Sequence, residues 1–304
     1  MLNSGFNQTL LVILGPTASG KTDLAINAAK WLDTEIISAD SRQFYRELNI
    51  GTAKPTPDQI ASVKHHLIGQ ISIHDRYNIS DFENDVLSLL EKLFQKHDVV
   101  VMCGGSGLYI DAVCNGIDDQ PEHDPAIRQQ LDQEYRTNGI VYLQNELHRL
   151  DPDYYRQVDI SNPHRLMRAL EVCHMTGKPY SSFRTGLKKS RPFKIVKFGI
   201  DVPREELIKR INARTDAMIS AGLIDEAREN LVNRHLNSLN TVGYKEMFDF
   251  LDGKCSLEEA VEKIKVNTRR YAKRQMTWFR KDVEIKWIKP ELFTDMIIHE
   301  ALDR

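Results

Sequence analysis

The sequence has few cysteines and no long apolar run. Its 304 residues include four cysteines, Cys103, Cys114, Cys173 and Cys255, which are scattered and form no C-x-x-C pair. That excludes a disulfide-stapled scaffold and a cysteine zinc site, and it is typical of reduced thiols in the cytoplasm. No apolar run approaches the roughly 18 residues that a membrane-spanning helix needs. The first residues, MLNSGFNQ, lack the basic and apolar regions of a signal peptide, so we expect a cytoplasmic protein.

The sequence also lacks a large excess of either charge. Its 41 Lys and Arg residues nearly balance 43 Asp and Glu, which gives a formal net charge of −2. Two segments depart from this balance, because 184–197 holds six basic residues and 263–281 holds eight, both without an acid. One basic run is usually a solvated helix face, but two in a protein of this charge favour a surface for a polyanion. The aromatic residues within 263–281 fit a core at least as well as base stacking.

One stretch carries a phosphate-binding signature. Residues 10–22 read LLVILGPTASGKT, which is a buried strand, a glycine-bounded loop and the start of a helix-like run. Gly15, Gly20, Lys21 and Thr22 satisfy the G-x-x-x-x-G-K-[ST] pattern. The glycines let backbone N–H groups turn toward an anion, the helix presents its positive N-terminal end, and the Thr22 hydroxyl suits Mg²⁺. The pattern predicts a site for a diphosphate or a triphosphate and does not distinguish them.

A second polar motif follows the next strand. Residues 35–39 predict a short strand with Asp40-Ser41-Arg42-Gln43 at its C-terminal end. Ligands bind at C-terminal strand ends in open α/β sheets, so these residues should face the phosphate-binding loop. Asp40 is then a metal-shell ligand or a general base, and its structural alternative is to cap the next helix. We favour a functional role, and both functional roles stay open.

The third predicted strand has no acid where an ATPase needs one. Residues 98–103, DVVVMC, run into GGSGLY at 104–109, which we interpret as a flexible turn at the same crevice. A hydrolytic phosphate-loop enzyme typically ends such a strand with an Asp that organises Mg²⁺ and water. Asp98 stands at the opposite end of the strand. The pattern therefore weakens a generic ATPase hypothesis.

Two features lie between the second and third strands. His65-His66 falls in a connection, and adjacent side chains face different ways, so a structural role is favoured over a metal site. A helix is predicted over 81–96, with Ser80 as its N-cap and Glu83 at the capping-box position.

The alternation of strands and helices stops near residue 115. Residues 116–191 are helical, polar and charged. The remainder predicts a return strand over 193–202, a helix over 204–218 with Arg210 and Arg214 on one face, and a helix over 256–280 that ends the fold. We predict an α/β fold with two parts. A P-loop NTPase-like core with a parallel sheet and C-terminal helices comprises 1–115 and 192–304, and a helical insertion domain comprises 116–191.

Together these motifs closely resemble the tRNA dimethylallyltransferase family, also called tRNA isopentenyltransferases. The resemblance covers nearly the whole chain, from residue 10 to about 287, with the motifs in the family's order. The segments that carry the resemblance are GPTASGKT at 15–22, DSRQ at 40–43, IGTAKPT at 50–56, HHLI at 65–68, GGSGLY at 104–109, NPHRLMRALEV from 162, TVGYKE at 241–246 and YAKRQMTWFRK at 271–281. Ser106 stands where the family typically has Thr, and NPHR at 162–165 is a variant of the family's usual stretch.

The resemblance implies an enzyme that transfers a dimethylallyl group from dimethylallyl diphosphate to N6 of adenine 37 in tRNA and releases diphosphate. It implies that the phosphate-binding loop holds the diphosphate leaving group, with Mg²⁺ at Thr22, and that the insertion contacts the anticodon stem-loop. The partners would be tRNA and dimethylallyl diphosphate, without a membrane, and we expect a monomer.

The resemblance also assigns roles to individual residues. The catalytic residues would be Asp40, Thr17, Lys21 and Arg214. The diphosphate would be bound by Gly15, Pro16, Thr17, Ala18, Ser19, Gly20, Lys21 and Thr22. The RNA would be contacted by Asp40, Ser41, Arg42, Gln43, Ser106, Arg128, Asn162, Pro163, His164, Arg165, Leu166 and Met167. Asp40 is our candidate for the general base.

The sequence is also compatible with three alternative functions. The phosphate loop and Arg210 and Arg214, which resemble lid arginines, fit an ATP-dependent kinase of a small metabolite. The basic segments alone fit a non-catalytic RNA-binding protein. Isoprenyl transfer to free AMP is a closer rival, because the same site would serve it, but the basic helix and the insertion favour a macromolecular acceptor.

Overall fold

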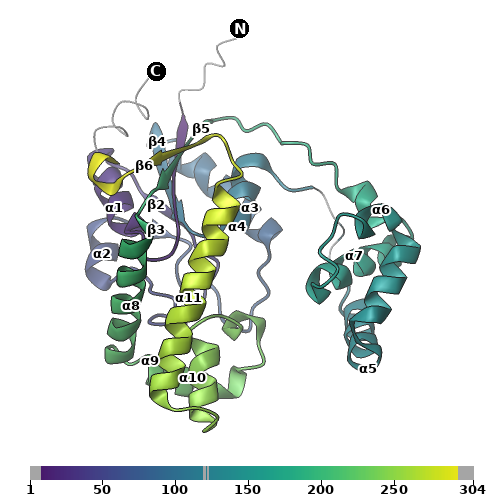
Figure 1. The fold of residues 1–304 in the computed structure, drawn as a ribbon. Coiled ribbons are helices and arrows are strands. Elements are labelled where there is room, and N and C mark those ends of the chain that lie inside the picture. The colour runs from purple at the N-terminus through teal and green to yellow at the C-terminus, as the bar shows by residue number, and fades with distance from the viewer. Residues whose placement is uncertain (1–7, 119–120, 122, 294–304) are drawn as a thin grey trace. The chain divides into compact units, whose positions relative to one another are not determined.

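The computed structural model describes residues 8–118, 121 and 123–293. The chain divides into two compact units, one formed by Met1–Asn115 and Arg191–Arg304 and the other by Gly116–Ser190 (Figure 1). The first unit holds the sheet, and the second is helical.

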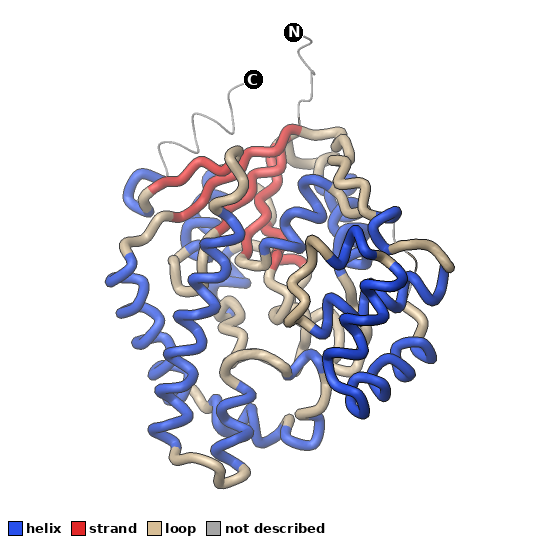
Figure 2. Tube along the Cα trace, turned by 45° about the vertical axis from the view of Figure 1, so that its right-hand side comes forward, coloured by secondary structure: helices blue, strands red, loops and turns tan. Residues whose placement is uncertain are grey.

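The sheet of the first unit has six parallel strands in the order β3-β2-β4-β1-β5-β6. Figure 2 shows the strands in red, with helices around them in blue. Its strands are β1 Thr9–Leu14, β2 Ile36–Ala39, β3 His65–His66, β4 Val99–Gly104, β5 Lys194–Ile200 and β6 Ile285–Ile288. All residues of β1, β2 and β4 are buried, as expected of parallel strands that helices cover on both faces. The predicted strands over 10–14, 35–39, 98–103 and 193–202 are confirmed as β1, β2, β4 and β5.

Eight helices among the described residues belong to the first unit and three to the second. The first has α1 Lys21–Trp31, α2 Pro57–Ser62, α3 Ile79–Leu93, α4 Gly107–Asn115, α8 Arg204–Ser220, α9 Leu223–Glu229, α10 Tyr244–Leu251 and α11 Leu257–Phe279. The second has α5 Pro125–Leu150, α6 Pro152–Tyr155 and α7 Pro163–Thr176. Short 3₁₀ turns occur at Tyr180–Phe183, Leu231–Asn233, Asn237–Leu239 and Pro290–Leu292.

Helices cover both faces of the sheet. Alternate residues of β1 point to opposite faces: Leu10, Val12 and Leu14 pack with apolar side chains of α3 and α4, whereas Leu11 and Ile13 pack with α1. A third apolar cluster, centred on Tyr244 and Met247, joins α9, α10 and the start of α11. The helices fix the sheet on both faces, and the motifs lie at the C-terminal ends of its strands β1, β2 and β4.

The second unit has its own core. Leu143 and Leu147 of α5 and Leu166 and Leu170 of α7 are fully buried in it. Helix α5 is broken at Gly139, whose φ of 69° lies in the left-handed region that glycine adopts without steric cost. Asn162 caps α7 by accepting a hydrogen bond from the Arg165 N–H at 3.3 Å.

Four details of the sequence prediction are wrong. Asn78, not Ser80, caps α3: its side chain accepts from the N–H groups of Ser80 and Asp81, and Asp81 returns the bond to the Asn78 N–H. His65 and His66 form edge strand β3, which pairs with β2. The fold does not end at α11, because β6 follows it and pairs with β5.

The fourth error concerns the glycine-rich turn after β4. Helix α4 begins at Gly107, so only part of the segment is a turn. A Cβ at Gly107 would lie 2.4 Å from Cδ1 of Trp278 on α11. Glycine is needed there for close packing rather than for flexibility.

Candidate active site

The loop between β1 and α1 has the geometry of an anion nest. Ala18 and Gly20 both have positive φ, 63° and 87°, and Gly20 precedes the first residue of α1. Such a curl turns successive N–H groups inward, at the positive end of the helix. A Cβ at Gly15 would approach the Ser19 hydroxyl oxygen at 3.0 Å. The loop is therefore built to hold an anion against Lys21 and Thr22.

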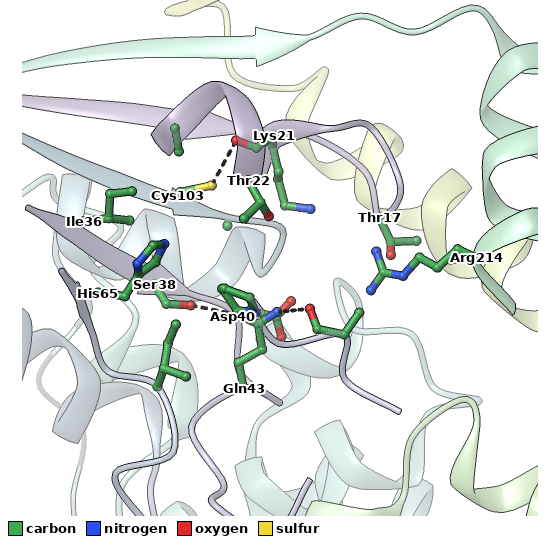
Figure 3. A pocket seen from close by; sticks show the side chains of 15 residues that line it. Thr17, Lys21, Thr22, Ile36, Ser38, Asp40, Gln43, His65, Cys103 and Arg214 are labelled. Atoms are coloured by element: carbon green, nitrogen blue, oxygen red, sulfur yellow. Dashed lines mark hydrogen bonds between the residues drawn. The ribbon is translucent and has the colours of Figure 1, made fainter. Parts of the chain in front are cut away.

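Two cations line the pocket beside this loop (Figure 3). Burial lowers the pKa of Lys21 and of Arg214 below their ordinary values, and the nearby Asp40 carboxylate opposes both shifts. Neither cation forms an ion pair with any residue that the structure describes. A site with two half-buried cations and one carboxylate close to both favours a ligand with several negative charges.

Asp40 follows β2 and lines the same pocket. Its Oδ1 accepts a hydrogen bond from the Arg42 N–H at 3.0 Å, so Asp40 also stabilises the turn that it begins. This bond gives Asp40 a structural role, in a turn rather than at a helix cap, and leaves its functional role open. Because the bond engages one oxygen, the other can interact with a ligand.

The end of β4 has no room for an acid. A Cβ at Gly104 would lie 2.1 Å from the Ala39 carbonyl oxygen, so any side chain there would displace β2. Cys103, the last residue before it, lines the pocket, and burial raises the pKa of its thiol to about 12. The thiol is neutral at physiological pH. At Gly104 there is thus no room for a carboxylate, and at Cys103 a neutral thiol stands instead of one.

The pocket also has apolar walls. Apart from its polar residues it is lined by Ala25, Ile36, Ala53, Pro55 and Ile68. Figure 3 shows Ile36, His65 and Cys103 on the side opposite Thr17 and Arg214. Burial lowers the pKa of His65, which favours its neutral form. The pocket therefore offers charge at one side and a largely neutral surface at the other.

The other residues of the 40–43 motif are engaged within the protein. Arg42 Nη1 donates to the carbonyl oxygens of Asn237 and Ser238 at 3.0 and 3.1 Å. Gln43 accepts from the Ser38 hydroxyl at 3.2 Å and donates to the carbonyl oxygen of Ala53 at 3.0 Å. The bonds of Gln43 connect it to Ser38 and Ala53, and all three residues line the pocket.

Sequence reasoning missed the group that fixes the neighbouring loop. The buried Glu226 carboxylate accepts from the N–H groups of Asn49, Ile50 and Gly51, each at 2.8 Å, and from the Tyr244 hydroxyl at 2.6 Å. The next residues of that loop, Ala53 and Pro55, line the pocket. A buried acid far along the sequence gave no local signal.

The two basic segments differ in the structure. In 184–197, Arg191 is buried and paired with Glu83 at 2.5 Å, and Lys197 is buried between Asp282 and Glu284 at 2.8 and 2.9 Å. Those two residues are structural, which corrects the prediction that the whole segment faces a polyanion.

The segment 263–281 lies on α11 and just beyond it. Lys263, Arg270, Arg274 and Lys281 are exposed, and their spacing of seven, four and seven residues places them on one face. We name these four residues the basic stripe. Lys265 differs, because it pairs with Asp216 at 2.8 Å.

The aromatic residues of this segment fall into two groups. Phe279 is buried in the core, at 2% exposure, whereas Tyr271 and Trp278 are 36% and 37% exposed. The core interpretation therefore holds for one of the three.

The predicted RNA-contacting residues of the second unit also fall into two groups. Leu166 and Met167 are 0% and 2% exposed in the unit's core and present no side-chain surface to a ligand. His164 and Arg165 are exposed at the start of α7. Arg128 is partly exposed, and its Nε lies 3.7 Å from Oδ2 of Asp132.

The described part of the chain holds no cluster of three or more His, Cys, Asp or Glu side chains that could bind a metal by themselves. A magnesium ion at Thr22 would then depend on ligand oxygens, which is the usual way that Mg²⁺ is held beside phosphates. None of the described helices is long and apolar enough to cross a membrane.

Comparison with known proteins agrees with this geometry. The tRNA dimethylallyltransferase 1 of Bacteroides thetaiotaomicron is 53% identical over 289 residues, 95% of this chain and 94% of that protein. The tRNA dimethylallyltransferase of Christiangramia forsetii is 56% identical over 280 residues, 92% and 93% of the two chains. The crystal structure of the full-length tRNA isopentenylpyrophosphate transferase from Bacillus halodurans superposes with a TM-score of 0.70 at 34% identity and covers 97% and 96% of the chains. The family model described as IPP transferase matches residues 43–282, and the chain therefore belongs to the IPP transferase family of tRNA dimethylallyltransferases.

Proposed function

We propose that this protein transfers the dimethylallyl group of dimethylallyl diphosphate to N6 of adenine 37 in tRNA and releases diphosphate. Membership of the family supports the reaction. The observation that carries the proposal is the pocket itself, in which the half-buried Lys21 and Arg214 lie beside an anion nest while β4 has no acid at its end. Such a pocket suits a leaving diphosphate better than ATP hydrolysis.

The reaction requires the adenine amino nitrogen to attack the allylic carbon that bears the diphosphate. As the carbon–nitrogen bond forms, the carbon–oxygen bond breaks and negative charge develops on the diphosphate. Lys21, Arg214 and the loop N–H groups, together with Thr17, are placed to stabilise this charge. The nitrogen becomes cationic and loses a proton, for which we propose Asp40 as the general base.

We propose that Mg²⁺ is bound with the diphosphate, through the Thr22 hydroxyl and phosphate oxygens. Thr22 follows Lys21 at the start of α1 and lines the pocket, which supports this placement. When bound, Mg²⁺ would add positive charge beside the leaving group. Asp40 remains the candidate for a further ligand if it is not the base.

We propose that tRNA is bound by the basic stripe and by the insertion domain 116–191. Of the residues expected to contact RNA, Asp40 lines the pocket, and Ser41 beside it bonds to the Ser106 hydroxyl oxygen. Candidates on the insertion are Arg128, Asn162, Pro163, His164 and Arg165. Leu166 and Met167 are not among these candidates, because their side chains are buried in the core of the second unit. The target adenine must leave its stack to reach a pocket, as enzymes that modify bases require. We further propose that the protein acts in the cytoplasm as a monomer.

The proposal is tested by a transfer assay with an anticodon stem-loop RNA, dimethylallyl diphosphate and Mg²⁺. We expect mass spectrometry to find one dimethylallyl group on the target adenine. A matched RNA whose target purine lacks the amino group should remain unmodified. Faster modification of AMP than of the RNA would instead establish transfer to the free nucleotide, and absence of transfer to either would overturn the proposal.

A further inference from the structure

One buried amide of α11 connects two loops of the site. Gln275 lies on the buried face of that helix and is 7% exposed. Its Oε1 accepts a hydrogen bond from the Thr17 N–H at 2.9 Å, and its Nε2 donates to the Gly105 carbonyl oxygen at 2.8 Å. Thr17 belongs to the phosphate-binding loop after β1, and Gly105 belongs to the turn after β4. The two loops are thus joined through a residue about 170 positions or more along the chain from each.

The connection continues from Gly105 to the residues around Asp40. The Ser106 N–H donates to the Ala39 carbonyl oxygen at 3.2 Å, and the Ser106 hydroxyl oxygen accepts from the Ser41 N–H at 3.0 Å. These bonds hold the residues immediately before and after Asp40. A path of hydrogen bonds therefore runs from Thr17, through Gln275 and the 105–106 turn, to the two neighbours of Asp40.

The groups along this path are closely packed. A Cβ at Gly105 would lie 2.4 Å from Nε2 of Gln275, so the amide packs directly against the backbone of the turn. One turn further along α11, Trp278 Nε1 donates to Asp111 Oδ2 at 2.8 Å and fixes the helix against α4. The same helix carries most of the basic stripe, and through Gln275 it contacts the phosphate-binding loop.

The bonding pattern requires an amide. The Thr17 N–H needs an acceptor, whereas the Gly105 carbonyl needs a donor, and a glutamine supplies both from one planar group. A methionine of similar length supplies neither, and an ionised glutamate supplies only the acceptor. Both partners are backbone groups in a largely buried site, where an unsatisfied group is costly.

We propose that Gln275 is a positioning residue that sets the spacing between the diphosphate side of the pocket, at Thr17, and the acceptor side, at Asp40. The inference rests on the proposed transfer reaction and adds to it a residue that does not itself touch the substrates. Transfer between two bound substrates depends steeply on the distance between the reacting atoms, and a displacement of about 1 Å costs about 10² in rate. Gln275 should therefore affect the rate within the ternary complex more than the binding of either substrate.

The test compares Gln275→Met with Asn267→Leu, a matched substitution two turns earlier on α11. Asn267 Nδ2 donates to Glu246 Oε1 at 2.7 Å, so this control also removes an amide bond of the same helix but away from the pocket. Single-turnover transfer is measured with saturating dimethylallyl diphosphate and anticodon stem-loop RNA. Mg²⁺–pyrophosphate affinity, stem-loop affinity and the melting temperature are measured on the same samples.

We expect Gln275→Met to lower the single-turnover rate by about 10- to 100-fold, with both separate affinities nearly unchanged. Asn267→Leu should keep the rate of the unmodified protein even where it lowers the melting temperature. A rate for Gln275→Met equal to that of the control would overturn the positioning role. Absence of transfer by the unmodified protein would instead refute the proposed function, so the two failures are distinguishable.

Gln275→Glu gives a second test if the methionine variant does not fold. Its ionised carboxylate keeps the bond from Thr17 but faces the Gly105 carbonyl oxygen without a proton. Once protonated, the carboxyl group donates as the amide does. The rate of this variant relative to the unmodified protein should therefore rise as the pH falls, and a constant ratio would contradict the proposal.

Discussion

The pocket cations and the basic stripe carry the same charge in different surroundings. Lys21 and Arg214 are held in a pocket where burial lowers their pKa values and one carboxylate lies near both. The four residues of the stripe are exposed on one face of α11 and just beyond it. Charges in a low-dielectric site act strongly on the few groups beside them, whereas exposed charges act weakly and are screened by salt. The pocket should therefore govern chemistry at one bond, and the stripe should govern the affinity for RNA.

The largest expected effect comes from the carboxylate beside the pocket cations. Asp40→Asn keeps the shape of the side chain and the bond from the Arg42 N–H but cannot take a proton. We expect turnover to fall by about 10²–10⁴, the usual range for acid–base catalysis, with much smaller changes in substrate affinity. Single-turnover rates and diphosphate affinity measured on the same variant check this. If Mg²⁺-dependent diphosphate binding weakens while the chemical rate stays normal, Asp40 is a metal ligand and not the base.

A somewhat smaller loss is expected from Lys21→Met, which removes one pocket cation and keeps most of the side-chain length. Losing one group that stabilises developing charge costs about 10²–10³ in kcat. The affinity for diphosphate should fall as well, because the leaving group is already charged when it binds. The affinity for tRNA and its salt dependence should not change. If Lys21→Met changed the salt dependence of tRNA binding, Lys21 would contribute to RNA affinity, and the pocket and the stripe would not have separate roles.

The smallest effect per residue is expected at the stripe. Changing Lys263, Arg270, Arg274 and Lys281 to glutamine should weaken tRNA binding and lower the slope of log affinity against log salt by roughly 0.7–0.9 for each lost phosphate contact. Diphosphate affinity should remain the same. Lys265→Gln is the control, because that lysine is on the same helix but paired with Asp216. If the fourfold variant binds tRNA as tightly as the control, the stripe is only a solvated face.

Local patterns in the sequence were enough to predict most of the core of the first unit. The run from Leu10 to Thr22 combined an apolar strand, two glycines and a helix start, and the structure has β1, the nest and α1 there. The C-terminal helix was confirmed at nearly its predicted bounds because Ser256 caps it through a capping box with Glu259. Strand β6 was missed, since four residues at the edge of a sheet carry little periodicity.

Contacts between distant segments could not be predicted in the same way. The sequence showed Arg191 and Lys197 as members of a basic segment. Their partners Glu83, Asp282 and Glu284 lie 85 to 108 positions away from them along the chain. The basic count alone could not separate them from the exposed stripe. Gln275 did leave a weak signal, because it is a polar residue on the buried face of α11 between Ala272 and Phe279. Such a residue is usually bonded to something, although its partners appear only in the fold.

The pocket cations should hold the diphosphate of an allyl donor rather than ATP. Calorimetric titration of the protein with dimethylallyl diphosphate and with ATP, each with Mg²⁺, tests it directly, and the same samples are analysed for ADP. We expect the allyl diphosphate to bind tightly, ATP to compete only weakly, and no ADP to form. Tighter binding of ATP together with turnover to ADP would show that the pocket is a nucleotide site and would contradict the proposed transfer.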